Sequence, residues 1–229
     1  MKYRYFLFDL DDTLLDFKAS ERLSFFRTMA SVGVSGDFDA AFRAYQAENT
    51  KLWLQFEKGF ITKDFLKVER FRLALATANI DADPNVVSSR YLDMLPEAVV
   101  LLDGAREICE HLSAWGEVGI ITNGIEHVQT KRIANSGLSP WLSFVATSEA
   151  CGFAKPDARF FEYSTQRFTT FNKAEAIIIG DRLDADILGG NQFGIESCWF
   201  NPMGIENNTS ARPTMEVASL SEIPARLSC

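Results

Sequence analysis

The chain has 229 residues, 47% of them hydrophobic and 24% charged, with a net charge of −8 at pH 7. This length allows one large domain or a core with a smaller inserted one. The negative charge argues against a nucleic-acid polymer bound through a broad basic face. It leaves an anionic small molecule open as a ligand, because a bound metal can dominate the local field.

The sequence shows no signal-peptide pattern and no apolar run of transmembrane length. The four cysteines, Cys109, Cys151, Cys198 and Cys229, are far apart and form no CxxC pattern. Free thiols of this kind are typical of a reducing compartment. We therefore expect a cytoplasmic protein without a membrane partner; the oligomeric state is left open.

The first predicted strand, Arg4–Asp9, ends in a run of acids. Residues 5–15 read YFLFDLDDTLL, and the apolar stretch Tyr5–Phe8 predicts a strand buried on both faces of a parallel sheet. Open α/β sheets bind ligands where such strands end. Asp9 and Asp11 can bind a divalent cation there, or act as nucleophile and general acid/base. For this motif alone, an acidic cap on the strand remains the alternative.

The stretch 16–97 is predicted to be helical throughout. Aromatic residues recur at helical spacing, and turns are expected at Gly33–Gly36 and Asp81–Pro84. About 80 residues are too many for a simple crossover between two parallel strands. We expect four helices forming a domain at 16–97, inserted into a core made of 1–15 and 98–229.

Strands and helices alternate in the rest of the chain. The further predicted strands are Glu117–Thr122, Ser143–Thr147, Ala176–Gly180 and Glu196–Phe200. The predicted helices are Ala105–Ala114, Glu126–Ser136, Asp157–Phe168 and Ala185–Gln192. This alternation predicts an α/β fold, a Rossmann-like parallel sheet flanked by helices, with the all-helical insertion.

Two later motifs carry groups suited to binding phosphate. Thr122, Asn123 and Gly124 follow a strand, where a hydroxyl and backbone N–H groups can reach phosphate oxygens. Lys155 stands just before a predicted helix, where anions are favoured. Taken singly, the alternatives are a polar turn and a solvated surface lysine.

A third motif, GDRLDAD at 180–186, brings more carboxylates to a strand end. Asp181 is expected to meet Asp9 and Asp11 at the sheet edge and complete a hard-cation site, whereas Asp184 can be explained as a helix cap. Carboxylates gathered without a cation raise one another's pKa. Mg²⁺ together with Lys155 would balance this charge.

The ordered set DLDDT, ITNG, AKPD and GDRLDAD resembles the haloacid dehalogenase-like hydrolase superfamily. The resemblance implies that Asp9 is the nucleophile that becomes an aspartyl phosphate and that Asp11 is the general acid/base. It implies that Thr122, Asn123 and Lys155 bind the phosphoryl group. Mg²⁺ would be held by Asp9, Asp181 and the backbone carbonyl of Asp11, with Asp186 acting through a water or Lys155. The helical insertion would be the family's mobile cap.

The resemblance also indicates a substrate class. Haloacid dehalogenases lack an acid at the position of Asp11, so its presence favours phosphate esters. The cap length and the segments 197–204 and 213–217 resemble the pyrimidine 5′-nucleotidase branch, which implies nucleoside monophosphates as substrates. The alternatives are a sugar-phosphate or phosphoglycolate phosphatase, a phosphomutase, and a non-catalytic binding protein with the same fold.

Overall fold

The computed structural model describes residues 2–228 and divides into two compact units. An α/β unit contains the residues up to Phe17 and those from Val99 onward, and a helical unit spans Lys18–Ala98.

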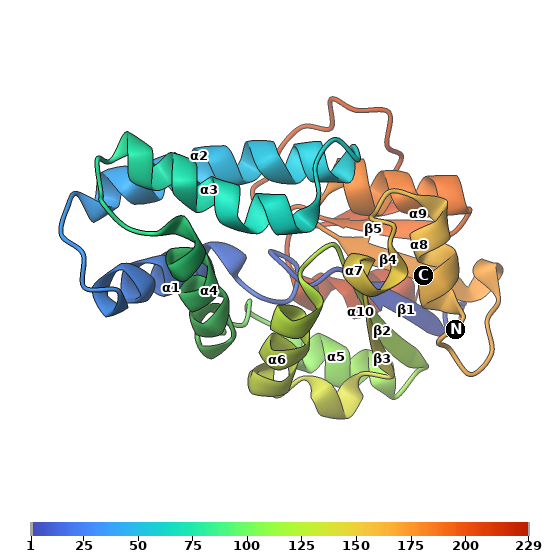
Figure 1. Cartoon of the computed structure of the whole chain (residues 1–229). Helices are drawn as coiled ribbons and strands as arrows, with labels where there is room; N and C mark the ends of the chain where they lie inside the picture. Colours follow the sequence, from blue (N-terminus) through green and yellow to red (C-terminus); the bar gives the residue numbers. More distant parts are fainter. Residues whose placement is uncertain (1, 229) are drawn as a thin grey trace. The chain divides into compact units, whose positions relative to one another are not determined.

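The α/β unit is built on a six-stranded parallel sheet with strand order β3-β2-β1-β4-β5-β6 (Figure 1). The strands are β1 (Tyr5–Phe8), β2 (Glu117–Thr122), β3 (Phe144–Thr147), β4 (Ala176–Gly180), β5 (Glu196–Phe200) and β6 (Met215–Val217). The predicted α/β fold is confirmed. The prediction missed β6, which has three residues and buries Val217 fully but leaves Glu216 exposed.

The central position of β1 explains where the site lies. Phe8 is in register with Ile120 of β2 and Ile179 of β4. The chain proceeds from β1 to β2 on one side and returns to β4 on the other. Ligands of open α/β sheets bind at such a switch point, beyond the carboxyl ends of the strands.

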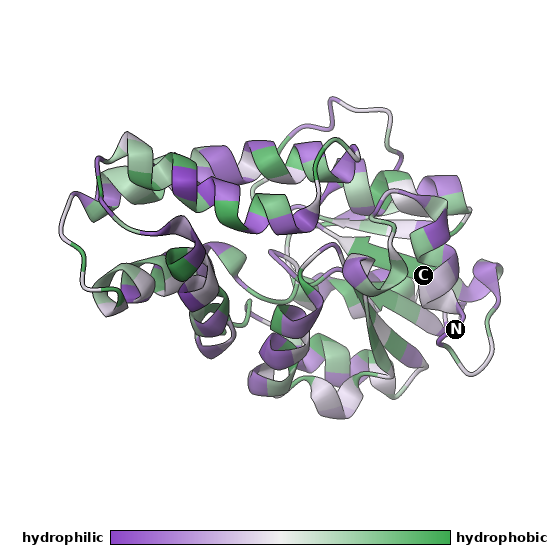
Figure 2. Ribbon diagram, in the orientation of Figure 1, coloured by the Kyte–Doolittle hydropathy of each residue, from purple (hydrophilic) through white to green (hydrophobic). Residues whose placement is uncertain are grey.

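Helices cover both faces of this sheet, and alternate residues of β1 supply the two cores. Phe6 and Phe8 belong to one hydrophobic cluster, and Tyr5 and Leu7 to another. Figure 2 shows the strands as largely hydrophobic. The helices are α5 (Ala105–Ser113), α6 (Glu126–Ser136), α7 (Ser148–Cys151), α8 (Ala158–Thr165), α9 (Leu188–Phe193) and α10 (Ile223–Leu227). Short 3₁₀ turns occur at Ser139–Trp141, Lys173–Glu175 and Leu220–Glu222.

One predicted helix, Ala185–Gln192, was wrong at its start. A π turn, η4 (Leu183–Ile187), precedes α9. The carbonyl of Arg182 accepts from the backbone N–H of Asp186 at 2.9 Å and from that of Ile187 at 3.2 Å. This wider turn accompanies the complete burial of the Asp186 side chain. π turns of this kind are frequent at functional sites.

The helical unit contains α1 (Phe17–Ser31, whose first residue belongs to the α/β unit), α2 (Phe38–Glu57), α3 (Lys63–Thr77), α4 (Pro84–Met94) and a 3₁₀ turn at Leu95–Glu97. Its core is aromatic, with ring centroids 5.0–6.4 Å apart. The rings are those of Phe25, Phe42, Tyr45, Phe71 and Tyr91. The side chains of Asp37, Thr62 and Asp83 cap α2, α3 and α4. These five aromatic residues of the insertion therefore serve packing.

None of the helices between residues 2 and 228 is long and apolar enough to cross a membrane. Cys109, Cys151 and Cys198 are free thiols, as predicted, while Cys229 lies outside the described residues.

Candidate active site

The site forms around Asp9, the first residue after β1. Its backbone N–H donates to the carbonyl of Ile179 at 2.9 Å, which extends the β1–β4 pairing by one residue. The residue as a whole is 7% exposed. The sheet therefore holds this carboxylate at its central edge, between the ends of β2 and β4.

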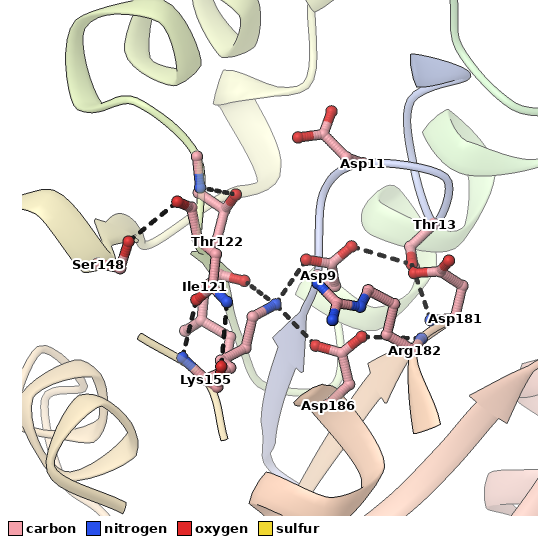
Figure 3. A network of polar contacts seen from close by, with 12 residues as sticks. Asp9, Asp11, Thr13, Ile121, Thr122, Ser148, Lys155, Asp181, Arg182 and Asp186 are labelled. Carbon is pink, nitrogen blue, oxygen red and sulfur yellow. Dashed lines mark hydrogen bonds and ion pairs between the residues drawn. The ribbon is translucent and has the colours of Figure 1, made fainter. Parts of the chain in front are cut away.

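Lys155 is buried beside Asp9, so the alternative of a solvated surface lysine was wrong (Figure 3). Its Nζ donates to Asp9 Oδ1 at 2.5 Å, to Asp186 Oδ1 at 2.7 Å and to the carbonyl of Ile121 at 2.9 Å. Asn123 holds the lysine backbone from both sides. Its Oδ1 accepts the Lys155 N–H at 2.8 Å, and its Nδ2 donates to the Lys155 carbonyl at 3.1 Å.

Three carboxylates gather around this ammonium. One side-chain oxygen each of Asp9, Asp181 and Asp186 lies within 4.8 Å of the others. The hydroxyl of Thr13 lies 3.3 Å from Asp9 Oδ2 and 3.4 Å from Asp181 Oδ1, and it accepts the backbone N–H of Asp181 at 3.2 Å. Hard divalent cations prefer such a set of oxygen donors.

The electrostatics of this cluster favour an added positive charge. Burial raises the pKa of Asp9 to about 7; Lys155 opposes this shift, while Asp186 and Asp11 add to it. Burial, followed by the charges of Asp9 and Asp186, raises the pKa of Asp181 to about 8. Burial and the neighbouring carboxylates both disfavour the charged forms of Asp9 and Asp181, so the donor set fits a divalent metal ion.

Gly180 makes room for Asp186 in this cluster. A Cβ at this glycine would lie 2.3 Å from Asp186 Oδ2. The same oxygen accepts the backbone N–H of Arg182 at 3.1 Å. The backbone of Asp181 is fixed from the other side, since its carbonyl accepts from Trp199 Nε1 at 2.9 Å.

The carboxylate of Asp11 is not part of the metal-type cluster. Figure 3 shows its side chain apart from the group formed by Asp9, Lys155 and Asp186. Its Oδ2 accepts from Gln129 Nε2 at 2.7 Å, and its Oδ1 accepts from Arg132 Nη1. Two side chains of α6 therefore hold this acid.

The hydroxyl of Thr122 has its hydrogen available for donation. It accepts the backbone N–H of Gly124 at 3.1 Å and one hydrogen of Gln129 Nε2 at 3.0 Å. A hydroxyl has two lone pairs and one hydrogen. Both acceptor positions are thus used, and the hydroxyl hydrogen finds no acceptor within residues 2–228.

The structure thus gathers Asp9, Lys155, Asp181 and Asp186, with Asn123 holding the Lys155 backbone, and keeps the Asp11 side chain and Thr122 on the Gln129 side. The sequence did not indicate three further residues, Thr13, Gln129 and Arg132. Thr13 adjoins the acidic run, and its position was the one available signal. The two α6 residues are ordinary polar side chains at helical spacing, a pattern that gives no signal of a site.

Comparison with known proteins agrees with this geometry. Residues 3–194 match the family model described as haloacid dehalogenase-like hydrolase. The HAD-hydrolase YfnB of Bacillus subtilis is 36% identical over 224 residues, covering 97% of this chain and 94% of that protein. Its crystal structure bound to magnesium has a TM-score of 0.91 at 35% identity, with both chains covered completely.

Two further relatives are pyrimidine 5′-nucleotidases. PynA of Streptococcus pneumoniae is 38% identical, covering 97% of this chain and 94% of that protein. YjjG of Escherichia coli is 29% identical, with 97% of each chain covered. The chain belongs to the haloacid dehalogenase-like hydrolase family, as its motifs predicted.

Proposed function

We propose that this protein is a Mg²⁺-dependent phosphomonoester hydrolase acting on pyrimidine nucleoside 5′-monophosphates through an aspartyl phosphate on Asp9. The observation that carries the proposal is the buried Asp9–Lys155 pair at the carboxyl end of the central strand, within a cluster of carboxylates. Phosphoryl transfer requires positioning and charge neutralisation above all.

The carboxylates of Asp9 and Asp181 and the backbone carbonyl of Asp11 would hold Mg²⁺. Asp186 is already engaged by Lys155 and by the backbone of Arg182, which suits it to support Lys155. When bound, Mg²⁺ supplies positive charge to the phosphoryl oxygens.

The other residues take roles that follow from their contacts. In the first step an oxygen of Asp9 forms a bond to phosphorus while the bond to the leaving oxygen breaks, and Asp11 gives its proton to that oxygen. In the second step Asp11 takes a proton from water, whose oxygen attacks phosphorus and releases Asp9. Lys155 and the Thr122 hydroxyl stabilise the charge on the phosphoryl oxygens.

The substrate assignment rests on the relatives and on the helical unit. PynA and YjjG are pyrimidine 5′-nucleotidases, and each is matched over nearly its whole length. We assign 1–15 and 98–229 to the catalytic core and 16–97 to a substrate-selecting cap, boundaries within two residues of the two compact units. Cytoplasmic localisation is part of the proposal, supported by the free thiols.

The test is phosphate release from pyrimidine and purine nucleoside 5′-monophosphates, sugar phosphates and phosphoglycolate, each with Mg²⁺ and with EDTA. We expect Mg²⁺-dependent release that is fastest from pyrimidine monophosphates. Asp9→Asn should abolish release while leaving the circular dichroism spectrum unchanged. Preference for sugar phosphates would replace the substrate and keep the mechanism, whereas activity retained by Asp9→Asn would refute the nucleophile. No release from any ester would leave a mutase or a binding protein as the better explanation.

A further inference from the structure

Gln129 contacts both Asp11 and Thr122. In the proposed reaction Asp11 acts on the leaving oxygen and Thr122 on a phosphoryl oxygen. Both hydrogens of its Nε2 are donated, one to Asp11 Oδ2 at 2.7 Å and one to the Thr122 hydroxyl at 3.0 Å. Its Oε1 accepts from Arg132 Nη1 at 2.9 Å. Gln129 is 2% exposed, and its amide has a defined partner at each end. Its orientation is therefore determined completely by this network.

Arg132 completes the arrangement at a cost to stability. The side chain is fully buried, it donates to Asp11 and Gln129 through Nη1, and its guanidinium lies 5.5 Å from the ring of Phe17. Its Nε and Nη2 have no hydrogen-bond partner among residues 2–228. Buried donors without partners oppose folding. Packing alone thus does not explain why an arginine occupies this position.

Gly124 provides the space for the amide. A Cβ at this position would lie 2.2 Å from Gln129 Nε2 and 2.7 Å from Gln129 Cγ. The strand end and α6 thus approach closely enough for one glutamine to reach both Thr122 and Asp11.

We propose that Gln129, supported by Arg132, is a positioning residue that aligns the proton-donating carboxyl group of Asp11 with the phosphoryl-binding hydroxyl of Thr122. This inference rests on the proposed phosphatase function. By accepting from Gln129, Thr122 keeps its own hydrogen for a phosphoryl oxygen. The Gln129 amide fixes the position of the Asp11 carboxyl group relative to the Thr122 hydroxyl, so that one group reaches the leaving oxygen while the other holds the phosphoryl group. Alignment of this kind accelerates the step in which both groups act.

The leaving group distinguishes this role from a purely structural one. An alkoxide requires a proton from Asp11, whereas p-nitrophenolate is stable without one. The measured quantity is the ratio of kcat/KM for the best-hydrolysed alkyl monophosphate of the panel to kcat/KM for p-nitrophenyl phosphate, because kcat/KM extends only to departure of the leaving group and excludes the water attack that both esters share. Gln129→Ala should lower this ratio by about tenfold or more, because general acid catalysis and its alignment contribute factors of this size. The KM for the alkyl ester should change much less than kcat.

Two further variants control for folding. Gly124→Ala keeps Gln129 but displaces its amide, and it should lower the same ratio. Val128→Ala removes apolar atoms at a buried neighbour on α6 and keeps both Gln129 and Arg132, so it should leave the ratio unchanged.

The outcomes separate the two proposals. If the wild type is active and Gln129→Ala slows both esters equally, or Val128→Ala shifts the ratio as much, the positioning role is refuted and the phosphatase function stands. If the wild type hydrolyses no ester, both proposals fall.

Discussion

Replacing Lys155 by methionine tests the charge balance of the site directly. The change removes the ammonium and keeps an apolar side chain of similar length. It breaks the contacts with Asp9 at 2.5 Å, with Asp186 at 2.7 Å and with the Ile121 carbonyl at 2.9 Å. Three carboxylates would then remain together without the cation that now joins two of them.

The expected loss of stability is large. Removing one partner of a buried ion pair costs about 3–5 kcal/mol because the other charge stays buried. For a chain of this size, that corresponds to a fall in the melting temperature of roughly 6–20 °C. Uptake of a proton by Asp9, whose pKa burial already raises to about 7, offsets part of the cost. Mg²⁺ should offset more, since it restores positive charge among the carboxylates.

The assay is thermal and urea unfolding in EDTA and in Mg²⁺, with Lys131→Met as the control. Lys131 lies exposed on α6, so its replacement should change the unfolding free energy by less than about 0.5 kcal/mol. Adding Asp9→Asn to Lys155→Met should cost less than the sum of the single changes, because the two residues are in contact. Equal unfolding midpoints for Lys155→Met and Lys131→Met in EDTA would refute the reasoning.

Three other outcomes are expected. Asp181→Ala should raise the Mg²⁺ concentration for half-maximal activity by about tenfold or more, since it removes a charged ligand; an unchanged Mg²⁺ titration contradicts its role as a ligand. Gly180→Ala should lower the free energy of unfolding in urea by about 1–3 kcal/mol, because its Cβ would lie 2.3 Å from Asp186; a urea midpoint equal to that of the wild type would contradict this. Burial raises the pKa of Cys109 and Cys198 to about 12 each, so iodoacetamide should reach them only after unfolding; peptide mapping that finds either thiol alkylated in the native protein refutes this.

The sheet could be predicted to a large extent because its strands are buried on both faces. Continuous apolar runs identified β2, β4 and β5 with the bounds observed. The signal failed for β6, which is short and half-exposed. The hydrophobic pattern also failed to predict η4. A π turn and an α turn differ only in the carbonyl that accepts from each backbone N–H, and the pattern of residues does not determine that choice.

The catalytic candidates at the strand ends follow from the sequence because parallel strands deliver their carboxyl ends to one edge. Asp9, Thr122 and Asp181 each stand directly at or after such an end, so local pattern and sheet topology suffice to place them at the same edge of the sheet. Lys155 precedes a helix, and its positive charge indicated a phosphate-binding role. Its burial beside Asp9 could not be predicted from the sequence.

Only the tertiary structure decided which side chains hold Asp11. Gln129 and Arg132 lie 118 and 121 residues away along the chain and reach it from a helix face. That contact depends on the packing of α6 near the end of β1 and on the space left by Gly124. Catalytic residues within a short motif can be recognised from the sequence, because they are neighbours along the chain. Residues that position them from distant segments cannot be recognised in this way, because they come close only after the sheet and its helices have packed.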